Sequence, residues 1–220
     1  MKIKRLIAIL ACAAGLGLPA LADLPVNGQT YKEIKVDLNK DGHQERVFLE
    51  AYNCGEYQFF GQLKVADDQG NIIWHGPRPT DPSDPAMFGG FDYGVADMEA
   101  IFDVFGDGSK SIIGSMPQSD VRPQVWRVWK WDGKKFVRKF AKCLVEKPAS
   151  SGHYLWAEAP YDYGRDRWIS KFEVTENGRI IADITDYTDP AKCKWGQAYV
   201  APYGNGKGMH IVKWIQSPKF

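Results

Sequence analysis

The side chains best suited to chemistry stand in the short polar stretch DLNKDGHQER, residues 37–46. Asp37, Asn39 and Asp41 alternate along it, and a glycine follows the last of them at once. Ca²⁺ takes oxygen ligands at about 2.3–2.6 Å in flexible loops, so oxygen side chains at alternate positions favour this cation. The expected ligands are the backbone carbonyl of His43 and the side chains of Asp37, Asn39, Asp41 and Glu45. The alternative is a polar turn of the Asx type that holds no metal.

This stretch is not an EF-hand, because Phe48 stands where that motif requires a bidentate glutamate. It resembles instead the Asp-x-Asn-x-Asp-Gly-x-x-Glu loops of the FG-GAP and VCBS repeat families. The resemblance implies a loop between two strands of a propeller blade. All the expected protein ligands come from one loop, and the sequence shows no second carboxylate cluster that could hold a substrate. We therefore expect the Ca²⁺ to be structural and not catalytic.

A weak internal repeat includes this loop. Residues 102–115, FDVFGDGSKSIIGS, align with residues 36–49, VDLNKDGHQERVFL. The second copy keeps two aspartates, Asp103 and Asp107. It loses the middle and the last ligand, because Phe105 and Ser111 stand at these positions. We expect the second loop to be a structural turn. A repeated strand–loop–strand unit is typical of propellers and of double meanders.

Strand patterns separated by turn signals fill the rest of the chain. Alternating residues on both sides of Asn177-Gly178 predict a hairpin with a type I′ turn, in which both central residues have positive φ. Further hairpins are expected around Asp132-Gly133 and around residues 68–71. No amphipathic helix pattern is visible after residue 22. We predict an all-β fold, an antiparallel β-meander that is propeller-like and forms a single domain.

The first 22 residues have the three parts of a secretory signal peptide. Basic residues near the start precede an apolar run from Leu6 to Leu18, and Ala-Leu-Ala at 20–22 has the form of a cleavage site. Cys12 loosely resembles a lipoprotein processing site, which leaves a lipid-anchored form open. The mature chain, residues 23–220, is then periplasmic or secreted. No transmembrane segment is expected, because no later stretch approaches about 18 apolar residues.

The composition of the mature chain limits its partners. Without the three basic residues of the signal peptide, 25 Lys and Arg stand against 27 Asp and Glu, which gives a net charge near −2. A nucleic-acid partner, which needs a basic surface, is therefore not expected. Three cysteines remain: Cys54, Cys143 and Cys193. An oxidising compartment favours one disulfide bond, with Cys143 and Cys193 as the preferred pair and one thiol left over.

The sequence carries none of the common enzyme motifs. It has no Gly-x-Ser-x-Gly, no His-Glu-x-x-His and no phosphate-binding glycine loop. Its four histidines are scattered, and no two of them have the spacing of a ligand pair. We predict that the protein is not an enzyme. A hydrolase with a carboxylate pair of the glycosidase type stays an open alternative.

The remaining signal is SSGHYLW, residues 150–156. A Ser-Gly loop has little bulk and offers a hydroxyl, so it can enter a narrow cleft while Tyr154 anchors it nearby. Ser151-Gly152-His153-Tyr154 resembles the Ser-x-x-Tyr loop of periplasmic inhibitors of invertebrate-type lysozyme. The resemblance implies that Ser151 reaches the catalytic carboxylates of a lysozyme-like cell-wall hydrolase and that Tyr154 supports it. Related immunity proteins against peptidoglycan-hydrolase toxins combine such a fold with a calcium loop. The alternative for Ser151-Gly152 is an ordinary surface turn.

Two further segments are candidates for partner contacts. Tyr161, Arg165 and Arg167 are of the types that dominate interface energetics, although a solvated loop before a core tryptophan is the alternative. The Pro-rich loop 76–94 is long enough to be functional or disordered. The sequence as a whole predicts an exported, non-enzymatic protein that inhibits a peptidoglycan hydrolase. The alternative is a calcium-stabilised propeller module that binds carbohydrate or a cell surface.

Overall fold

The computed structural model describes residues 24–81, 84, 86–90, 98–116, 125–149, 152–154, 158–159, 167–186, 194–202 and 209–217. Within these residues all the secondary-structure elements are β-strands, and all the strand pairs are antiparallel. The predicted all-β, antiparallel fold is therefore confirmed. The predicted signal peptide, residues 1–22, lies outside the described residues.

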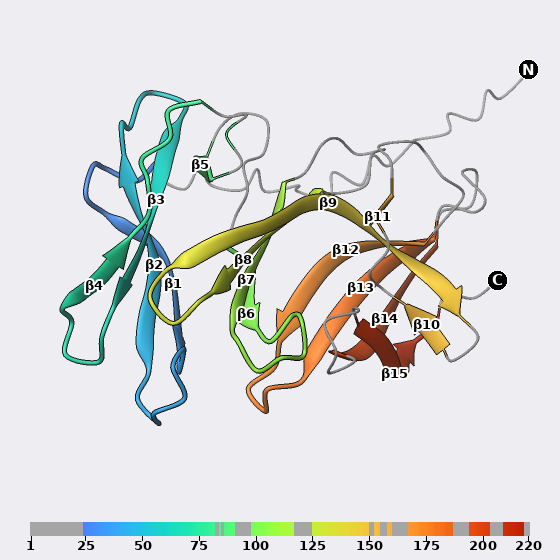
Figure 1. Cartoon of the computed structure of the whole chain (residues 1–220). Helices are drawn as coiled ribbons and strands as arrows, with labels where there is room; N and C mark the ends of the chain where they lie inside the picture. Colours follow the sequence, from blue (N-terminus) through green and yellow to red (C-terminus); the bar gives the residue numbers. More distant parts are fainter. Residues whose placement is uncertain are drawn as a thin grey trace, which may run out of the picture.

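Most of the strands belong to three four-stranded meanders, which follow one another along the chain (Figure 1). Unit 1 consists of β1 (Thr30–Val36), β2 (Glu45–Tyr52), β3 (Phe59–Ala66) and β4 (Ile72–His75). Unit 2 consists of β6 (Ala100–Phe102), β7 (Ser111–Met116), β8 (Val125–Trp131) and β9 (Phe136–Ala149). Unit 3 consists of β12 (Arg167–Val174), β13 (Ile180–Asp186), β14 (Lys194–Pro202) and β15 (Met209–Gln216). Three short strands complete the set: β5 (Phe88–Gly90), β10 (Gly152–Tyr154) and β11 (Glu158–Ala159).

The long strand β9 joins units 2 and 3. Unit 1 and β5 form a five-stranded sheet, whereas units 2 and 3 with β10 and β11 form one ten-stranded sheet. The first part of β9 pairs with β8, and beyond it Val145 and Glu146 pair with Trp168 and Arg167 of β12. In Figure 1, β9 accordingly arches from the middle of the molecule toward unit 3. Among the described strands no ring of blades closes, so the propeller-like arrangement stays a prediction.

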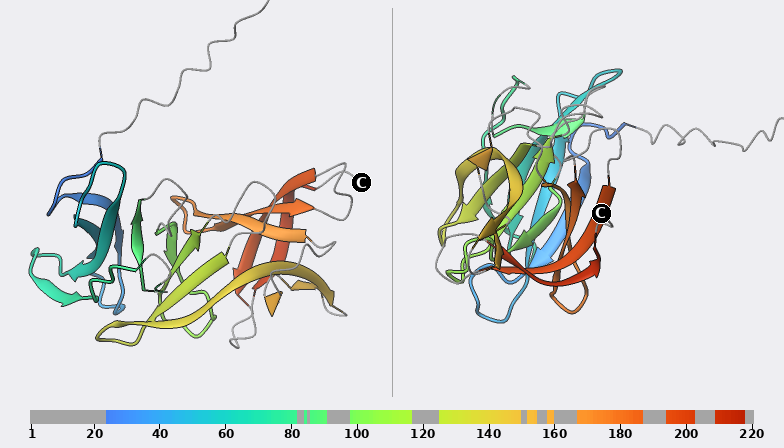
Figure 2. Two further views of the ribbon diagram at one scale, coloured as in Figure 1. Left: turned by 90° about the horizontal axis from the view of Figure 1, so that it is seen from above. Right: turned by 90° about the vertical axis from the view of Figure 1, so that its right-hand side faces the viewer.

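The three units lie side by side in chain order (Figures 1 and 2). Two apolar cores lie between them. Successive residues of a strand point to opposite faces, so unit 2 contributes to both cores. In β7, for example, Ile112 belongs to the core with unit 1 and Ile113 to the core with unit 3, and both are fully buried. The core between units 1 and 2 contains Leu38, Val47, Leu49, Leu63, Val65, Phe88, Met98, Ile101, Ile112, Trp129, Trp131 and Phe136.

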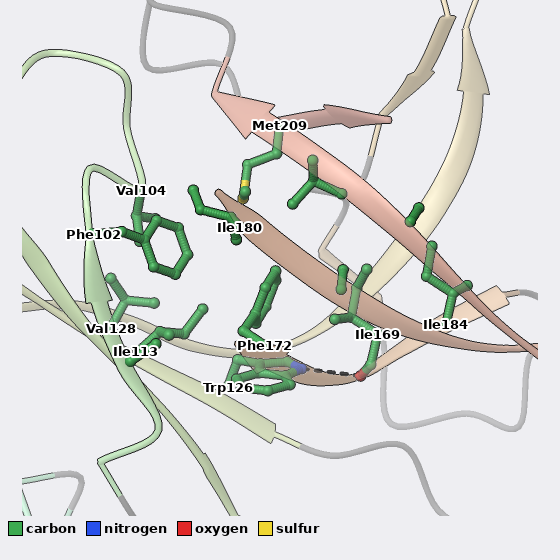
Figure 3. Close-up of a cluster of buried hydrophobic side chains, with 14 residues drawn as sticks. Phe102, Val104, Ile113, Trp126, Val128, Ile169, Phe172, Ile180, Ile184 and Met209 are labelled. Carbon is green, nitrogen blue, oxygen red and sulfur yellow. Dashed lines mark hydrogen bonds between the residues drawn. The ribbon is translucent and has the colours of Figure 1, made fainter. Parts of the chain in front are cut away.

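The core between units 2 and 3 is arranged around Trp126 and Phe172 (Figure 3). Their rings meet edge to face with centroids 4.9 Å apart, a favoured geometry for aromatic pairs. The Trp126 indole Nε1 donates a hydrogen bond to the Ile169 carbonyl oxygen at 3.1 Å, so this fully buried polar group is satisfied. The side chain of β8 is thereby tied to the backbone of β12.

The hairpins that the sequence predicts are present, but one turn differs in type. Asn177 is not among the residues with positive φ, whereas Gly178 has φ +71°. The Gly178 N–H donates to the Thr175 carbonyl oxygen at 2.8 Å, so the turn spans Thr175–Gly178 and only its last residue is left-handed. The predicted type I′ turn is wrong, because the Thr175 Oγ1 accepts the Arg179 N–H at 3.1 Å and favours the longer turn.

Part of the Pro-rich segment 76–94 is held against the rest of the protein. β5 pairs with β3, and Gly89 opposes Phe60 in this pairing. The buried Arg127 donates from Nη1 to the Met87 carbonyl oxygen at 3.1 Å and contacts the Asp84 carbonyl oxygen at 3.3 Å. Residues 82, 83, 85 and 91–94 of this segment lie outside the described residues.

The cysteine prediction is tested at one position only. Cys54 is half-buried and carries a free thiol, and burial raises the pKa of this thiol. Cys193 and the side chain of Cys143 lie outside the described part of the chain, so their disulfide bond stays a prediction.

Candidate calcium loop and partner-binding hairpin

The predicted calcium loop connects β1 to β2 and curls around the carboxylate of Asp37. Asp37 Oδ1 accepts the Lys40 N–H at 2.6 Å, and Oδ2 accepts the Gly42 N–H at 3.1 Å. Lys40 (φ +64°) and Gly42 (φ +89°) are both left-handed, which brings these N–H groups back toward Asp37. Glycine adopts this conformation without a steric cost, so Gly42 explains why the chain can turn here.

The other predicted ligands are also engaged within the loop. Asp41 Oδ1 accepts the His43 N–H at 2.8 Å, and Oδ2 accepts the Asn39 Nδ2 hydrogen at 3.0 Å. Asn39 Oδ1 in turn lies 3.3 Å from the Asp41 nitrogen. His43 Nδ1 lies 2.8 Å from Asp68 Oδ2, which connects the loop to the turn between β3 and β4.

Glu45 lies at the base of the loop and differs from the other predicted ligands in its burial. It is 4% exposed, and its Oε2 accepts the Leu38 N–H at 2.7 Å. A carboxylate in this place ties the end of the loop to its beginning. A buried backbone N–H needs such an acceptor, so Glu45 has a structural role whether or not a metal is bound.

The oxygen side chains therefore share one loop but do not converge on a single point. Among the residues that the structure describes, no three His, Cys, Asp or Glu side chains are grouped as metal ligands. The hydrogen bonds just described are those of an Asx-type turn. Asn39 and Asp41 are exposed, but their side chains are bonded to each other and, for Asp41, to the His43 N–H. The calcium site stays a prediction.

The second turn loop, between β6 and β7, has the same hydrogen-bond pattern. Asp103 Oδ1 accepts the Gly106 N–H at 2.7 Å, and Oδ2 accepts the Gly108 N–H at 2.7 Å. Asp107 Oδ1 accepts the Ser109 N–H at 3.0 Å, as Asp41 does with His43. Gly106 and Gly108 are left-handed, with φ +68° and +86°. The positions that correspond to Asp37, Asp41 and Gly42 thus do the same work in both loops.

The two loops differ in what balances their negative charge. In the second loop the Lys130 ammonium contacts Asp107 Oδ2 and lies 5.5 Å from the centre of the Phe105 ring. The hydrogen bond from Lys130 lowers the pKa of Asp107. Within the described residues, neither Asp37 nor Asp41 of the first loop has an ion-pair partner. The two loops thus differ at one pair of corresponding positions, because Asp107 has a cation partner and Asp41 has none among the described residues.

The predicted Ser-Gly segment lies at the end of a hairpin formed by β9 and β10. Gly152 pairs with Ala149, and Tyr154 pairs with Lys147. Only residues 150 and 151, which lie outside the described residues, separate the two paired strands. β10 also pairs with β15 through Tyr154 and His210, so its backbone is held on both sides.

The other predicted contact residues are described only in part. Arg167 is the first residue of β12, and its backbone pairs with Asp186 and with Glu146 of β9. Gly152 and Arg167 therefore both lie on strands next to β9. Tyr161 and Arg165, like Ser151, lie outside the described residues.

One feature of the fold was not found from the sequence. The first strands of the three units, β1, β6 and β12, line a groove of about 850 Å³. Only two of the units share an aspartate loop, and the third has a Thr-Glu-Asn-Gly hairpin in its place. The signal that could have revealed the third unit is the recurring pattern of four strands, independent of the aspartates.

Comparisons of the chain with models of protein families, with curated proteins and with solved structures find no match. In the described part of the chain, no helix is long and apolar enough to cross a membrane.

Proposed function

We propose that the protein is exported and inhibits a peptidoglycan hydrolase without being an enzyme itself. The observation that carries this proposal is the pairing of Ala149 with Gly152, which leaves only residues 150 and 151 to connect β9 and β10. A two-residue connection is the narrowest end that a hairpin can present. Ser151 is the second of these two residues and Gly152 is the first residue of β10, so the Ser-Gly pair that resembles those of the periplasmic lysozyme inhibitors stands at this position of the chain.

The hairpin has the support that a rigid inhibitory loop needs. β9 is also paired with β8 and β12, and β10 is also paired with β15. A loop held in its binding conformation loses little conformational entropy when it binds, which favours affinity. In the proposed complex the Ser151 hydroxyl donates a hydrogen bond to a catalytic carboxylate of the hydrolase, and the hairpin occupies the cleft in place of the glycan. Tyr154 then contacts the rim of the cleft.

Calcium has a structural role in this proposal. The uncompensated carboxylates of Asp37 and Asp41 support a Ca²⁺ site in the first loop, with Asn39, Glu45 and the His43 carbonyl as further ligands. The Lys130 ammonium already balances the charge of Asp107, which supports the proposal that the second loop binds no metal. A bound cation stabilises the native state by mass action, because the unfolded chain holds no preformed site.

A peptidoglycan-clearing assay tests the proposed inhibition. Mature protein, residues 23–220, is added to lysozymes of several types and to bacterial cell-wall hydrolases, and the loss of turbidity is followed. Slower clearing by at least one enzyme is the expected result. Clearing by every enzyme at its normal rate would count against the proposal.

A second candidate, a module that binds carbohydrate or a cell surface, rests on the outer face of unit 3. Trp195 is 55% exposed, and Gln197 and Tyr199 follow on the same face of β14. Gln197 Nε2 donates to Asp183 Oδ1 at 2.8 Å, and the Arg179 guanidinium lies 5.4 Å from the centre of the Tyr199 ring. Exposed aromatic rings can stack on sugars. In this second candidate function the three units are the blades of a propeller-like module. Binding to insoluble peptidoglycan that is lost in a Trp195→Ala variant, without inhibition of any hydrolase, would favour it.

A further inference from the structure

A pocket of about 540 Å³ lies where the two aspartate loops meet the hairpin of β8 and β9. Its volume is within the usual range of ligand sites, about 300–1,000 Å³. The first loop contributes residues 38–40 to the lining, and the second loop contributes Gly108 and Ser109. The remaining lining residues are 130–133 and 139, from β8, the following turn and β9. The pocket is thus built from three segments that are far apart in the sequence.

The charges in the lining favour an anionic ligand. The charged residues of the lining are three lysines and one aspartate: Lys40, Lys130, Lys139 and Asp132. Asp132 Oδ1 accepts two backbone N–H groups of its own turn, both at 2.9 Å. Lys130 is paired with Asp107, which lies outside the lining. When one lysine is set against each of these two aspartates, one positive charge remains in the pocket.

Lys40 extends its side chain from the first loop to the second. Its backbone is left-handed (φ +64°), a conformation that is uncommon for residues with a side chain. A Cβ added at Gly108 would run into Lys40 Nζ, so the ammonium group lies directly over this glycine. Asp37 and Asp41, the carboxylates of its own loop, instead bond N–H groups within that loop. Among the described residues, no carboxylate forms an ion pair with Lys40.

Lys139 belongs to the lining at an irregularity of β9. The pairing with β8 steps from Arg138 directly to Phe140, so Lys139 is the extra residue of a β-bulge. Such a bulge redirects a side chain from the regular alternation of the strand. Lys139 is exposed, and in the described part of the chain no carboxylate pairs with it. Together with the lysine of the first loop, it gives the pocket two ammonium groups without such a partner.

The donor groups of the pocket indicate which anion it fits. A lysine ammonium is a compact charge with three N–H donors, and it is a common binder of phosphate. Lys130 also keeps N–H donors beyond the one that contacts Asp107. A phosphate group offers three acceptor oxygens and up to two negative charges, whereas a carboxylate offers two oxygens and one charge. A phosphate group can therefore contact several of these ammonium groups at once.

We propose that this pocket binds the phosphate group of a ligand, with Lys40 and Lys139 as its main contacts and Lys130 as a further donor. Gly108 has no side chain and leaves room for the phosphate beside the Lys40 ammonium. The group belongs either to a free phosphate compound or to a lipid headgroup. Lys139 is near the start of β9 and the Ser-Gly hairpin is at its end, so this proposal is independent of hydrolase inhibition.

Titration calorimetry of mature protein with inorganic diphosphate tests the proposal. A metal-free buffer of low ionic strength keeps calcium out of the first loop and limits screening. A Lys40→Gln/Lys139→Gln variant removes the two ammonium groups. Both side chains are exposed, so this variant is expected to keep the thermal unfolding midpoint of the wild type. Lys35→Gln/Lys213→Gln, which removes two exposed lysines outside the lining, is the matched control.

A flotation assay distinguishes the two sources of the phosphate group. Phosphatidylcholine vesicles with and without phosphatidylglycerol are mixed with the same three proteins. Binding to the vesicles with phosphatidylglycerol alone, without binding of diphosphate and lost in the pocket variant, would identify a lipid headgroup as the ligand.

The expected result with diphosphate is saturable binding by the wild type and by the control with equal affinity. The affinity of the pocket variant should fall by about tenfold for each ammonium group removed, because each loses a hydrogen bond between charged groups. Binding that the pocket variant keeps, or that the control loses to the same extent, would overturn the proposal. Absence of binding in both assays would overturn it as well.

Discussion

The Lys130 ammonium lies against the Asp107 carboxylate, in the place where the first loop has only uncompensated acid groups around Asp41. Lys130 reaches this carboxylate from β8, where its backbone pairs with Ser111. The same turn is thus built twice, once with a cation from its own chain and once without. This difference is the reason why we propose a metal ion for the first loop and none for the second.

Removing that internal cation should weaken the protein modestly and in a pH-dependent way. Because the pKa of Asp107 is lowered in the folded state, the pair stabilises the protein above pH 4 and this contribution is lost as the pH falls further. The side chains of Lys130 and Asp107 are 22% and 42% exposed, so a Lys130→Met variant should lose no more than about 1 kcal/mol at neutral pH. Urea unfolding at pH 7 and pH 3 checks this, and an equal loss at both values would contradict it.

Calcium should raise the thermal unfolding midpoint of the mature protein. At a free concentration a hundredfold above Kd, a site present only in the native state contributes about 2.7 kcal/mol. An Asp41→Asn variant should lose the shift, whereas Asp107→Asn, the matching change in the second loop, should keep it. Scanning calorimetry with Ca²⁺ or a chelator measures all three proteins. A shift in none of them would show that the first loop is a metal-free turn.

Glu45 should matter even without calcium. Its carboxylate is the acceptor for the Leu38 N–H at 2.7 Å, and both residues are buried. Glu45→Ala leaves this N–H without an acceptor and should cost about 1–3 kcal/mol of unfolding free energy in the presence of a chelator. Glu45→Gln keeps a side-chain oxygen and should cost less. Equal stability of the two variants, measured by chemical unfolding, would speak against this role.

Gly89 should be irreplaceable in β5. It has φ +144°, and a Cβ there would run into the Phe59 carbonyl oxygen and lie 3.0 Å from the Phe60 Cα. Gly89→Ala should therefore destabilise the protein more than the roughly 1–2 kcal/mol of a left-handed alanine alone. Gly133→Ala is the control, because Gly133 has φ +97° with nothing within 4 Å of the added carbon. Thermal unfolding of both variants measures the loss of stability. A smaller loss for Gly89→Ala than for Gly133→Ala would contradict this prediction.

Much of the fold was predictable, because strand alternation and Asp-Gly or Asn-Gly turns are local signals. The hairpin of β8 and β9 around Gly133 and that of β12 and β13 around Gly178 are both present. The type of the second turn was not predictable from Asn177-Gly178, because the hydroxyl of Thr175, two residues earlier, decides it. Long-range pairings, such as that of β9 with β12, depend on residues far apart in sequence that no local pattern connects.

The candidate site was predictable in part for the same reason. The aspartate loop is a local motif, and its turn geometry depends on residues within it, such as Asp37, Lys40 and Gly42. Lys130 is 23 residues from Asp107, and nothing in the spacing shows that its ammonium reaches the second loop. The groove between β1 and β12 depends on how whole units pack, so it is visible only in three dimensions.

The most direct test of the central claim compares inhibition of a peptidoglycan hydrolase by the wild type and by a Ser151→Arg variant. Gln69→Arg, which places the same side chain at an exposed position in the turn between β3 and β4, is the control. We predict that the wild type and Gln69→Arg slow the clearing of peptidoglycan alike, and that Ser151→Arg loses most of this inhibition because its bulk no longer fits the cleft. Equal inhibition by all three proteins, or by none, would contradict a mechanism in which the β9–β10 hairpin blocks the enzyme.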